Sequence, residues 1–149
     1  MKIEEAIKQS AFKNEFEKAD VNILYTANWM NSRFHHLLKP YDISLQQFNI
    51  LRILRGQKGN PAPLKLITER MLDKMSNTSR LVEKMLIKQL LERNICPDNR
   101  RQVEIILTQK GLETCNEISA MMDKSRIETR SLTEKEATEL NRLLDKVRI

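Results

Sequence analysis

The sequence predicts a mostly α-helical protein with one small β-hairpin, arranged as a winged helix-turn-helix between long N- and C-terminal helices. Three observations lead to this fold class. The 149 residues include only three glycines and four prolines, fewer turn-forming residues than a strand-rich fold needs. Apolar residues recur every three or four positions along most of the chain, which is the period of an α-helix. Within residues 94–107, by contrast, the pattern is that of two strands joined by a turn.

The first long helix is predicted from Ile3 to about Lys39, a segment without proline or glycine. A continuous helix of that length would span about 55 Å, more than the core of so small a domain can cover. A second copy of the chain is the simplest cover for the remaining apolar stripe, and fraying or a break near Asp20 is the alternative. Pro40 ends the helix.

The next predicted helix begins at Ser44, which forms a capping-box pattern with Gln47, and its apolar face continues to Gly56. A turn region, Gln57–Pro63, follows.

Two helices after this turn have the outline of a helix-turn-helix. They are predicted at Leu64–Met71 and from Ser76, as the capping residue, to about Arg93. In such a motif the second helix enters the major groove of DNA by its N-terminal end. Paired short helices also occur in many other domains, so the next element matters.

That element is a predicted β-hairpin. Asn94–Pro97 and Gln102–Leu107 are predicted strands, and the turn Asp98–Arg101 between them carries two arginines. A hairpin with a basic turn directly after a helix-turn-helix is typical of a wing.

Two more helices complete the chain, one capped by Thr108 and running to about Arg130, the other capped by Thr133 with Glu136. Because the terminal helices have spare apolar surface, both ends are predicted to build one dimer interface. We therefore interpret residues 1–40 and 109–149 as dimerisation helices. Residues 41–108 form the winged-helix, DNA-binding region of the same structural unit.

The charge of the chain favours a polyanionic partner. The net charge is +6 and the isoelectric point is near 9.4, which suggests nucleic acid first and an anionic membrane surface second. The segment from Lys74 to Arg101 holds seven basic and three acidic residues, so +4 of the +6 lies where the fold would face DNA. Acidic neighbours among these cations argue against a membrane-binding helix.

The first turns of the second helix hold the candidate DNA-binding residues Ser76, Asn77, Thr78, Ser79 and Arg80, with Lys84 one turn further on. Asn77 and Arg80 are predicted to contact adenine and guanine, and the methyl group of Thr78 to meet that of thymine. Ser76 and Ser79 are assigned to the helix cap or to a phosphate. The alternative is that these residues only cap a helix, with Arg80 solvated.

The order of these elements and their local motifs resemble the MarR family of ligand-responsive repressors over nearly the whole chain. The motifs are LQQFNILRIL (45–54), LITERMLDKM (66–75), Ser79–Val82 with Leu90–Arg93, and DNRRQVEIILTQKG (98–111). The wing pattern of that family is present here as Asp98, Arg100, Val103, Ile105, Leu107, Thr108 and Gly111.

The resemblance implies a homodimer with interleaved terminal helices that controls its own or a neighbouring gene and is released by a small anionic or phenolic ligand. It also implies that Arg100 enters the minor groove, that Asp98 holds the turn or Arg100, and that Arg101 grips a phosphate. One departure concerns the loop Leu72–Met75, which is rich in apolar side chains. Met75 stands where a polar residue is common, so the base preference stays open.

An effector cleft between the dimerisation helices and the winged helix is a further expectation from the family. Its candidate residues are Tyr25, Trp29, His36, Phe48 and Arg52, although aromatic residues at helical spacing more often belong to a core. His35 and His36 are adjacent on a helix and cannot chelate from one face, so no metal site and no cofactor are predicted.

The two cysteines, Cys96 and Cys115, fit no metal spacing and suit a reducing cytosol. We interpret both as buried structural thiols, with redox sensing as the alternative. The start of the chain lacks a secretory pattern, and no apolar run approaches the roughly 20 residues of a membrane span. A cytoplasmic location without membrane contact is expected.

An enzyme is not expected, because the sequence lacks a glycine-rich phosphate loop, a GxSxG elbow and an HExxH pair. The predicted function is a sequence-specific regulator of transcription, a repressor that binds duplex DNA as a homodimer on a pseudo-palindromic operator. The alternative is a winged-helix adaptor that binds proteins, for which the hydroxyl groups and cations of Ser76–Lys88 are poorly suited.

Overall fold

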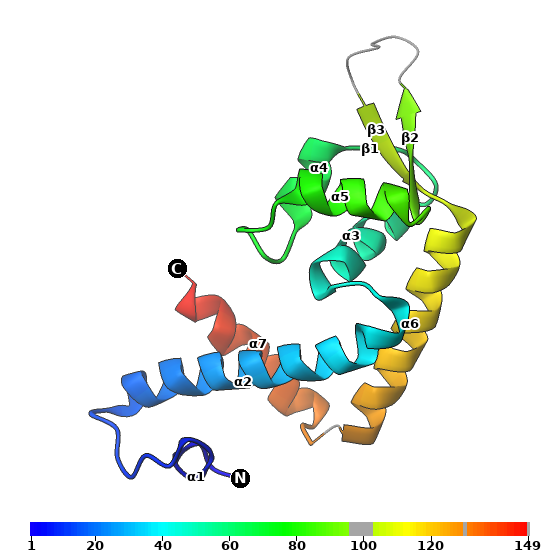
Figure 1. Cartoon of the computed structure of the whole chain (residues 1–149). Helices are drawn as coiled ribbons and strands as arrows, with labels where there is room; N and C mark the ends of the chain where they lie inside the picture. Colours follow the sequence, from blue (N-terminus) through cyan, green and yellow to red (C-terminus); the bar gives the residue numbers. More distant parts are fainter. Residues whose placement is uncertain (96–102, 130, 149) are drawn as a thin grey trace. The chain divides into compact units, whose positions relative to one another are not determined.

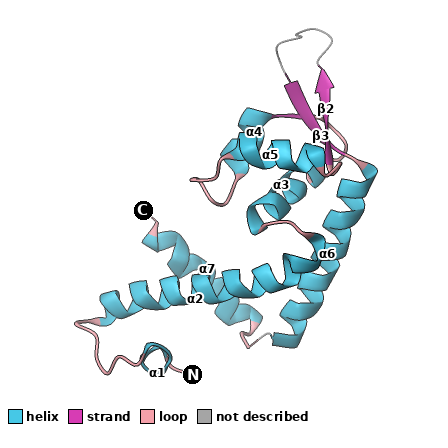
Figure 2. Cartoon of the chain, viewed as in Figure 1, coloured by secondary structure: helices cyan, strands magenta, loops and turns pink. Residues whose placement is uncertain are grey.

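The computed structural model describes residues 1–95, 103–129 and 131–148 (Figures 1 and 2). Contacts divide the chain into two units, Met1–Ile118 and Ser119–Ile149. In the first unit the described elements are α1 (Ile3–Ile7), α2 (Glu15–Leu38), the 3-10 helix η1 (Lys39–Tyr41), α3 (Leu45–Arg55), β1 (Ala62–Pro63), α4 (Leu64–Arg70), α5 (Thr78–Ile87), β2 (Leu91–Ile95) and β3 (Val103–Leu107). Helix α6 (Gln109–Thr129) begins in the first unit and ends in the second, which also contains α7 (Glu134–Val147).

The predicted continuous helix from Ile3 is wrong, and so is the alternative break near Asp20, because α1 and α2 are separated by residues 8–14. Lys8 ends α1 in a left-handed conformation, φ 55°. Asn14 then starts α2: its side-chain Oδ1 accepts the N–H of Glu17 at 2.9 Å. An ion pair of 2.7 Å between Lys18 and Glu4 ties the two helices together.

The end of α2 and the start of α3 follow the prediction. Pro40 lies in the first turn of η1, directly after α2. The capping box at α3 is confirmed: Ser44 Oγ accepts the N–H of Gln47 at 3.1 Å, and Gln47 Oε1 accepts the N–H of Ser44 at 2.9 Å. Gln47 is a buried polar side chain whose position is explained by this cap.

The core of the first unit lies between α3, α4, α5 and the sheet, which contact one another. Helix α3 buries its apolar face there, as expected from the sequence. The fully buried large side chains of the described chain include Leu38, Ile50, Leu51, Ile67, Met71 and Met85.

The sheet has three antiparallel strands in the order β1-β3-β2. Ala62 pairs with Ile105 across β1 and β3, and Leu91 pairs with Leu107 across β2 and β3. The hairpin of β2 and β3 was predicted, whereas β1 lies in the stretch that the sequence indicated only as a turn.

Helix α5 is shorter than predicted and β2 begins earlier. The helix ends at Ile87 rather than near Arg93, and Gln89 follows in a left-handed conformation, φ 58°. Leu90 and Leu91 are buried as expected, but β2 already begins at Leu91 instead of Asn94. Their apolar pattern therefore belongs to a turn and a strand, not to the last turn of a helix.

Thr108 starts α6 as predicted, since its Oγ1 accepts the N–H of Gly111 at 3.0 Å. The same hydroxyl donates to the carbonyl of Gln89 at 2.7 Å. Gly111 lies so close to the preceding segment that an added Cβ would be 2.0 Å from the carbonyl oxygen of Leu90. Only glycine fits this approach without a backbone shift.

The second unit has its own confirmed capping box. Thr133 Oγ1 accepts the N–H of Glu136 at 3.3 Å, and Glu136 Oε2 accepts the N–H of Thr133 at 2.7 Å. The backbone N–H of Thr133, followed by its hydroxyl, which donates to Glu136 Oε2 at 2.8 Å, holds the pKa of Glu136 below its usual value. Helix α7 buries none of its residues in the single chain, and it leaves Leu140, Leu143 and Val147 exposed.

Candidate nucleic-acid interface

The cap of α5 lies one residue later than predicted. The structure makes Asn77, not the predicted Ser76, the capping residue, and Asn77 Oδ1 accepts the N–H of Arg80 at 3.1 Å. Ser76 is the residue before the cap. Because each helical residue is rotated by about 100° from the last, the residues of α5 that pack into the core determine which of the others face solvent.

The inner face of α5 consists of Thr78, Val82 and Met85. Thr78 is only 5% exposed, so its methyl group and hydroxyl lie in the interior. This burial removes Thr78 from the residues that can meet a base edge, and we correct the prediction on this point.

The outer face of α5 carries Asn77, Arg80 and Lys84, which are all exposed, with exposed Ser79 between them. The spacing of three and four residues places Asn77, Arg80 and Lys84 on one side of the helix. Three of the six predicted residues of α5 and its cap, Asn77, Arg80 and Lys84, therefore share one solvent-facing side of the helix, from the N-terminal cap to the last turn.

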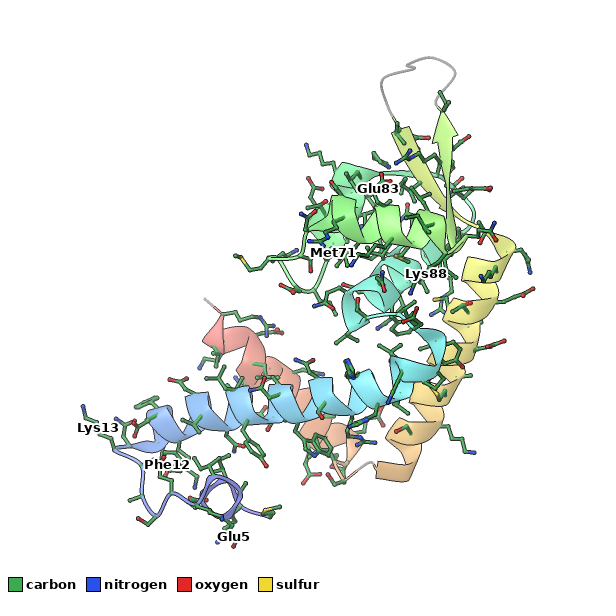
Figure 3. All side chains as sticks on the ribbon, viewed as in Figure 1. Glu5, Phe12, Lys13, Met71, Glu83 and Lys88 are labelled. Atoms are coloured by element: carbon green, nitrogen blue, oxygen red, sulfur yellow. The ribbon has the colours of Figure 1, made fainter. Side chains whose placement is uncertain are left out.

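The single carboxylate of α5, Glu83 (labelled in Figure 3), forms an ion pair with Arg93 of β2. This partner cancels a charge that would otherwise weaken an anion-binding surface next to Arg80 and Lys84. The pair also links α5 to the first strand of the hairpin.

Lys88, at the C-terminal end of α5, joins this helix to the segment before α3 (Figure 3). Its Nζ lies 2.9 Å from Asp42 Oδ2 and also donates to the carbonyl of Asp42. The hydrogen bond from Lys88 holds the pKa of Asp42 below its usual value, with the charge of Lys88 as the second cause. Lys110 of α6 donates to the carbonyl of Lys88 at 3.1 Å. We call the Asp42–Lys88 contact the α5 latch.

The loop between α4 and α5 is built around Asp73, a residue that the sequence analysis did not single out. Asp73 Oδ1 accepts the N–H of Met75 at 2.9 Å, and the Asp73 carbonyl accepts the N–H of Ser76 at 3.2 Å. The backbone hydrogen bond from Met75, followed by one from Gln46, lowers the pKa of Asp73. An aspartate whose side chain accepts the backbone N–H of the residue two positions later is a known turn signal, and it could have indicated this role.

Both strands of the wing are described, β2 up to Ile95 and β3 from Val103. Asp98, Arg100, Arg101 and Cys96 lie outside the described residues, so the roles predicted for them stay predictions. Cys115 is fully buried on α6, as the structural interpretation of this thiol expects.

The predicted effector residues lie on two helices, α2 and α3, and differ in exposure. Phe48 is buried on α3 beneath the guanidinium of Arg52, which lies 6.0 Å from the ring centre. Tyr25, Trp29 and His36 are exposed on α2, where Arg33 covers the ring of Trp29 at 4.9 Å.

A cavity of about 530 Å³ lies elsewhere in the first unit, between the end of α2, the start of α3 and the C-terminal end of α5. None of the five predicted effector residues lines it. Its basic lining residues are His35, Lys39, Lys84 and Lys88, and Asp42 of the α5 latch also lines it. This cavity was not predictable from local sequence patterns, because its walls come from three separated segments.

Two absences hold for the described residues. No group of three or more His, Cys, Asp or Glu side chains there is arranged to hold a metal ion. No helix in that part of the chain is both long enough and apolar enough to cross a membrane.

Comparison with known proteins gives the class of this fold. The model of the MarR family matches residues 43–103. The HTH-type transcriptional regulator MgrA of Staphylococcus aureus is 34% identical over 127 residues, which cover 83% of this chain and 84% of MgrA. These matches and the helix-turn-helix followed by a hairpin define a winged-helix transcriptional regulator.

Solved structures show the same fold. The organohalide-sensing regulator RdhR in its ligand-free form matches with a TM-score of 0.78 and 23% identity, over 93% of this chain and 86% of that one. Its form bound to 2,4-dichlorophenol matches with a TM-score of 0.73 and 25% identity, over the same shares. The MepR–DNA complex of S. aureus has a TM-score of 0.73 and 19% identity, over 91% of this chain and 96% of that one. The chain belongs to the MarR family.

Proposed function

We propose that this protein is a cytoplasmic repressor of transcription that binds a pseudo-palindromic operator in duplex DNA as a homodimer. The observation that carries the proposal is the division of α5 into two faces. Thr78, Val82 and Met85 are buried, while Asn77 and Arg80 are exposed next to the helix N-terminus and Lys84 is exposed on the same side in the last turn. Amide and guanidinium groups make bidentate contacts to adenine and guanine, and helix N-termini favour phosphate. MepR, which has the same fold, has been solved with DNA.

The homodimer is supported by apolar surface that the single chain leaves exposed. Phe16 and Leu24 on α2 and Leu140 and Leu143 on α7 face solvent. On α7 the exposed apolar residues recur at helical spacing, together with Val147, and an exposed apolar helix face of this kind marks an interface. We therefore keep residues 1–40 and 109–149 as the dimerisation segments and residues 41–108 as the DNA-binding region.

In the wing, Arg100 is proposed for the minor groove, Arg101 for a phosphate and Asp98 for holding the turn.

Release by an effector is the second part of the proposal. The cavity beside α5 has a basic lining of His35, Lys39, Lys84 and Lys88, which suits a small anionic or phenolic molecule. RdhR, with the same fold, has been solved with 2,4-dichlorophenol. We place the effector in this cavity in preference to the exposed rings of Tyr25 and Trp29. An effector that binds one arrangement of the dimer better than the other lowers DNA affinity by that difference.

Selection from random duplex DNA tests the regulator itself. Retained duplexes should share a pseudo-palindrome whose half-site centres lie about 10 base pairs apart, one turn of the double helix. Affinity for the selected duplex should fall steeply with salt, because bound phosphates release counterions. A folded protein that enriches no sequence would favour the alternative, a winged-helix adaptor for proteins.

A further inference from the structure

The loop between α4 and α5 presents two large apolar side chains to solvent. Leu72 is 79% exposed and Met75 is 93% exposed. Figure 1 shows this connection projecting beyond the ends of both helices. Exposed apolar residues on α2 and α7 are accounted for by the proposed dimer interface, but Leu72 and Met75 lie in the helix-turn-helix, immediately before α5.

Hydrogen bonds hold this loop in place. Leu72 donates its N–H to Asn49 Oδ1 of α3 at 2.9 Å, and Met75 donates its N–H to Asp73 Oδ1 at 2.9 Å. Gln46 Nε2 of α3 donates to Asp73 Oδ2 at 3.4 Å. The loop is thus anchored to α3 at two points, and Met75 is presented on a fixed backbone instead of on a frayed helix end.

The surroundings of Met75 indicate what it meets. Asn77, two residues on, caps α5 on the outer face that carries Arg80, and Lys74 adds a cation to the loop itself. Cations and a helix N-terminus bind the phosphates that flank a major groove. The apolar group that base edges display in that groove is the C5-methyl of thymine. A flexible thioether side chain next to the helix N-terminus fits that target.

We propose that Met75 is a specificity-determining residue that recognises thymine by contact with its C5-methyl group. The inference rests on the proposed function, because it requires α5 to enter the major groove by its N-terminal end. It adds a preference for thymine to the contacts of Asn77 and Arg80.

Replacing thymine by uracil in the selected operator tests the proposal, since uracil keeps the base pair and lacks the methyl. At one or more thymine positions in each half-site, the wild-type protein should bind the uracil duplex about fourfold more weakly, the equivalent of about 0.8 kcal/mol for one buried methyl-sized group. Met75→Gln, which keeps the length of the side chain, should lose about the same affinity on the thymine duplex. It should then bind the thymine and uracil duplexes equally.

Two further variants make the result specific. Met75→Leu keeps an apolar side chain and should keep the discrimination against uracil. Ile87→Gln changes another exposed apolar residue, at the opposite end of α5, and should discriminate like the wild type. Because Met75 is so exposed, Met75→Gln should unfold at the wild-type temperature, which circular dichroism checks.

Failure of this inference is distinguishable from failure of the proposed function. A protein that binds its selected operator with steep salt dependence, but whose wild type and Met75→Gln respond identically to uracil, overturns the role of Met75 alone. Loss of discrimination in Ile87→Gln would also overturn it, since the effect would then not be local to the loop. A protein that selects no operator overturns the DNA-binding function itself.

Discussion

Asn77 has two roles at the start of α5, and different substitutions separate them. Its Oδ1 caps the helix through the N–H of Arg80, while its Nδ2 remains able to donate. Asn77→Ala should lower the free energy of unfolding by about 1 kcal/mol, because the cap is lost. Asn77→Asp keeps the cap and suits the positive end of the helix dipole, so stability should be unchanged or higher.

The same pair of variants should behave differently on DNA. The carboxylate of Asn77→Asp would face phosphates, so this stable variant should bind the operator more weakly than the wild type. Urea denaturation and fluorescence titration with labelled operator give the two measurements. Operator affinity equal to wild type in Asn77→Asp would show that residue 77 is not at the DNA surface.

Arg80 is expected to be the main base-reading cation of the outer face. Arg80→Ala should weaken operator binding by roughly 1–3 kcal/mol and relax the sequence preference at one position of each half-site. Competition between the operator and single-base variants measures both effects. Arg148→Ala is the control and should bind like the wild type. Arg148 directly follows α7 and forms an ion pair with Asp145 in the last turn of that helix. A uniform loss over all sequences would assign Arg80 to a phosphate instead.

At the scale of secondary-structure elements, the α5 latch makes a pH-dependent contribution to stability. Contact with Lys88 lowers the pKa of Asp42 in the folded state below its ordinary value of 3.8. The contact therefore stabilises the fold above that ordinary value, and the stabilisation is lost as pH falls through the lowered pKa of the folded state. Because Asp42 is exposed, solvent keeps the effect small.

Asp42→Asn should accordingly be less stable than the wild type at neutral pH, and the difference should vanish on acidification below pH 3.8. Urea denaturation over a series of pH values measures it. In a Lys88→Met background the substitution should have no pH-dependent effect. A difference that persists there would mean that Asp42 acts through another partner.

The start of α6 depends on Gly111. Its replacement by alanine would place a Cβ 2.0 Å from the carbonyl oxygen of Leu90, so the helix or the segment before β2 must shift. Gly111→Ala should lower the free energy of unfolding by about 1–3 kcal/mol, as overpacking usually does. Gly56→Ala is a matched control, with its nearest atom at 3.2 Å, and should cost less in the same denaturation experiment.

The elements that the sequence predicted are those with local signals. Ser44, Thr108 and Thr133 cap their helices as expected, because a hydroxyl and a partner three residues later suffice to form the cap. The end of α5 was misplaced because Leu90 and Leu91 continue its helical spacing. In the structure Leu90 is buried in the turn after α5, and Leu91 is buried in β2, where it pairs with Leu107 of β3.

Features that depend on distant contacts were not predictable. Strand β1 exists because Ala62 pairs with Ile105, over forty residues later, and its own sequence indicates only a turn. For the candidate site, the outer face of α5 was predicted through Asn77, Arg80 and Lys84. Thr78 was assigned outward, but it shares the buried side of α5 with Val82 and Met85, four and seven residues further on. The cavity beside α5 was missed because no single segment forms it.

At the scale of the whole molecule, the exposed apolar residues of α7 are expected to lie in the dimer interface. Leu140, Leu143 and Val147 recur at helical spacing and share one face. Leu143→Glu should shift the protein from dimer to monomer in sedimentation experiments, because a charge cannot be buried there unpaired. Operator affinity should fall with it, since one monomer reaches only one half-site.

Asn141→Glu adds the same charge two positions earlier, at a residue outside that apolar spacing, and should leave the dimer intact. If Leu143→Glu stays dimeric, this face of α7 is not part of the interface. If it becomes monomeric but binds DNA as tightly as the wild type, the palindromic operator is excluded.

The two outer strands of the small sheet have a consequence for behaviour at high concentration. One edge is β1, only two residues long, in which Pro63 has no N–H to offer an incoming strand. The other edge is β2, whose exposed Glu92 and Arg93 place charges along it. Edges that are short, proline-containing or charged resist the edge-to-edge pairing that leads to fibrils. Along the described strands, the wing can therefore extend toward a binding partner without acting as a template for aggregation.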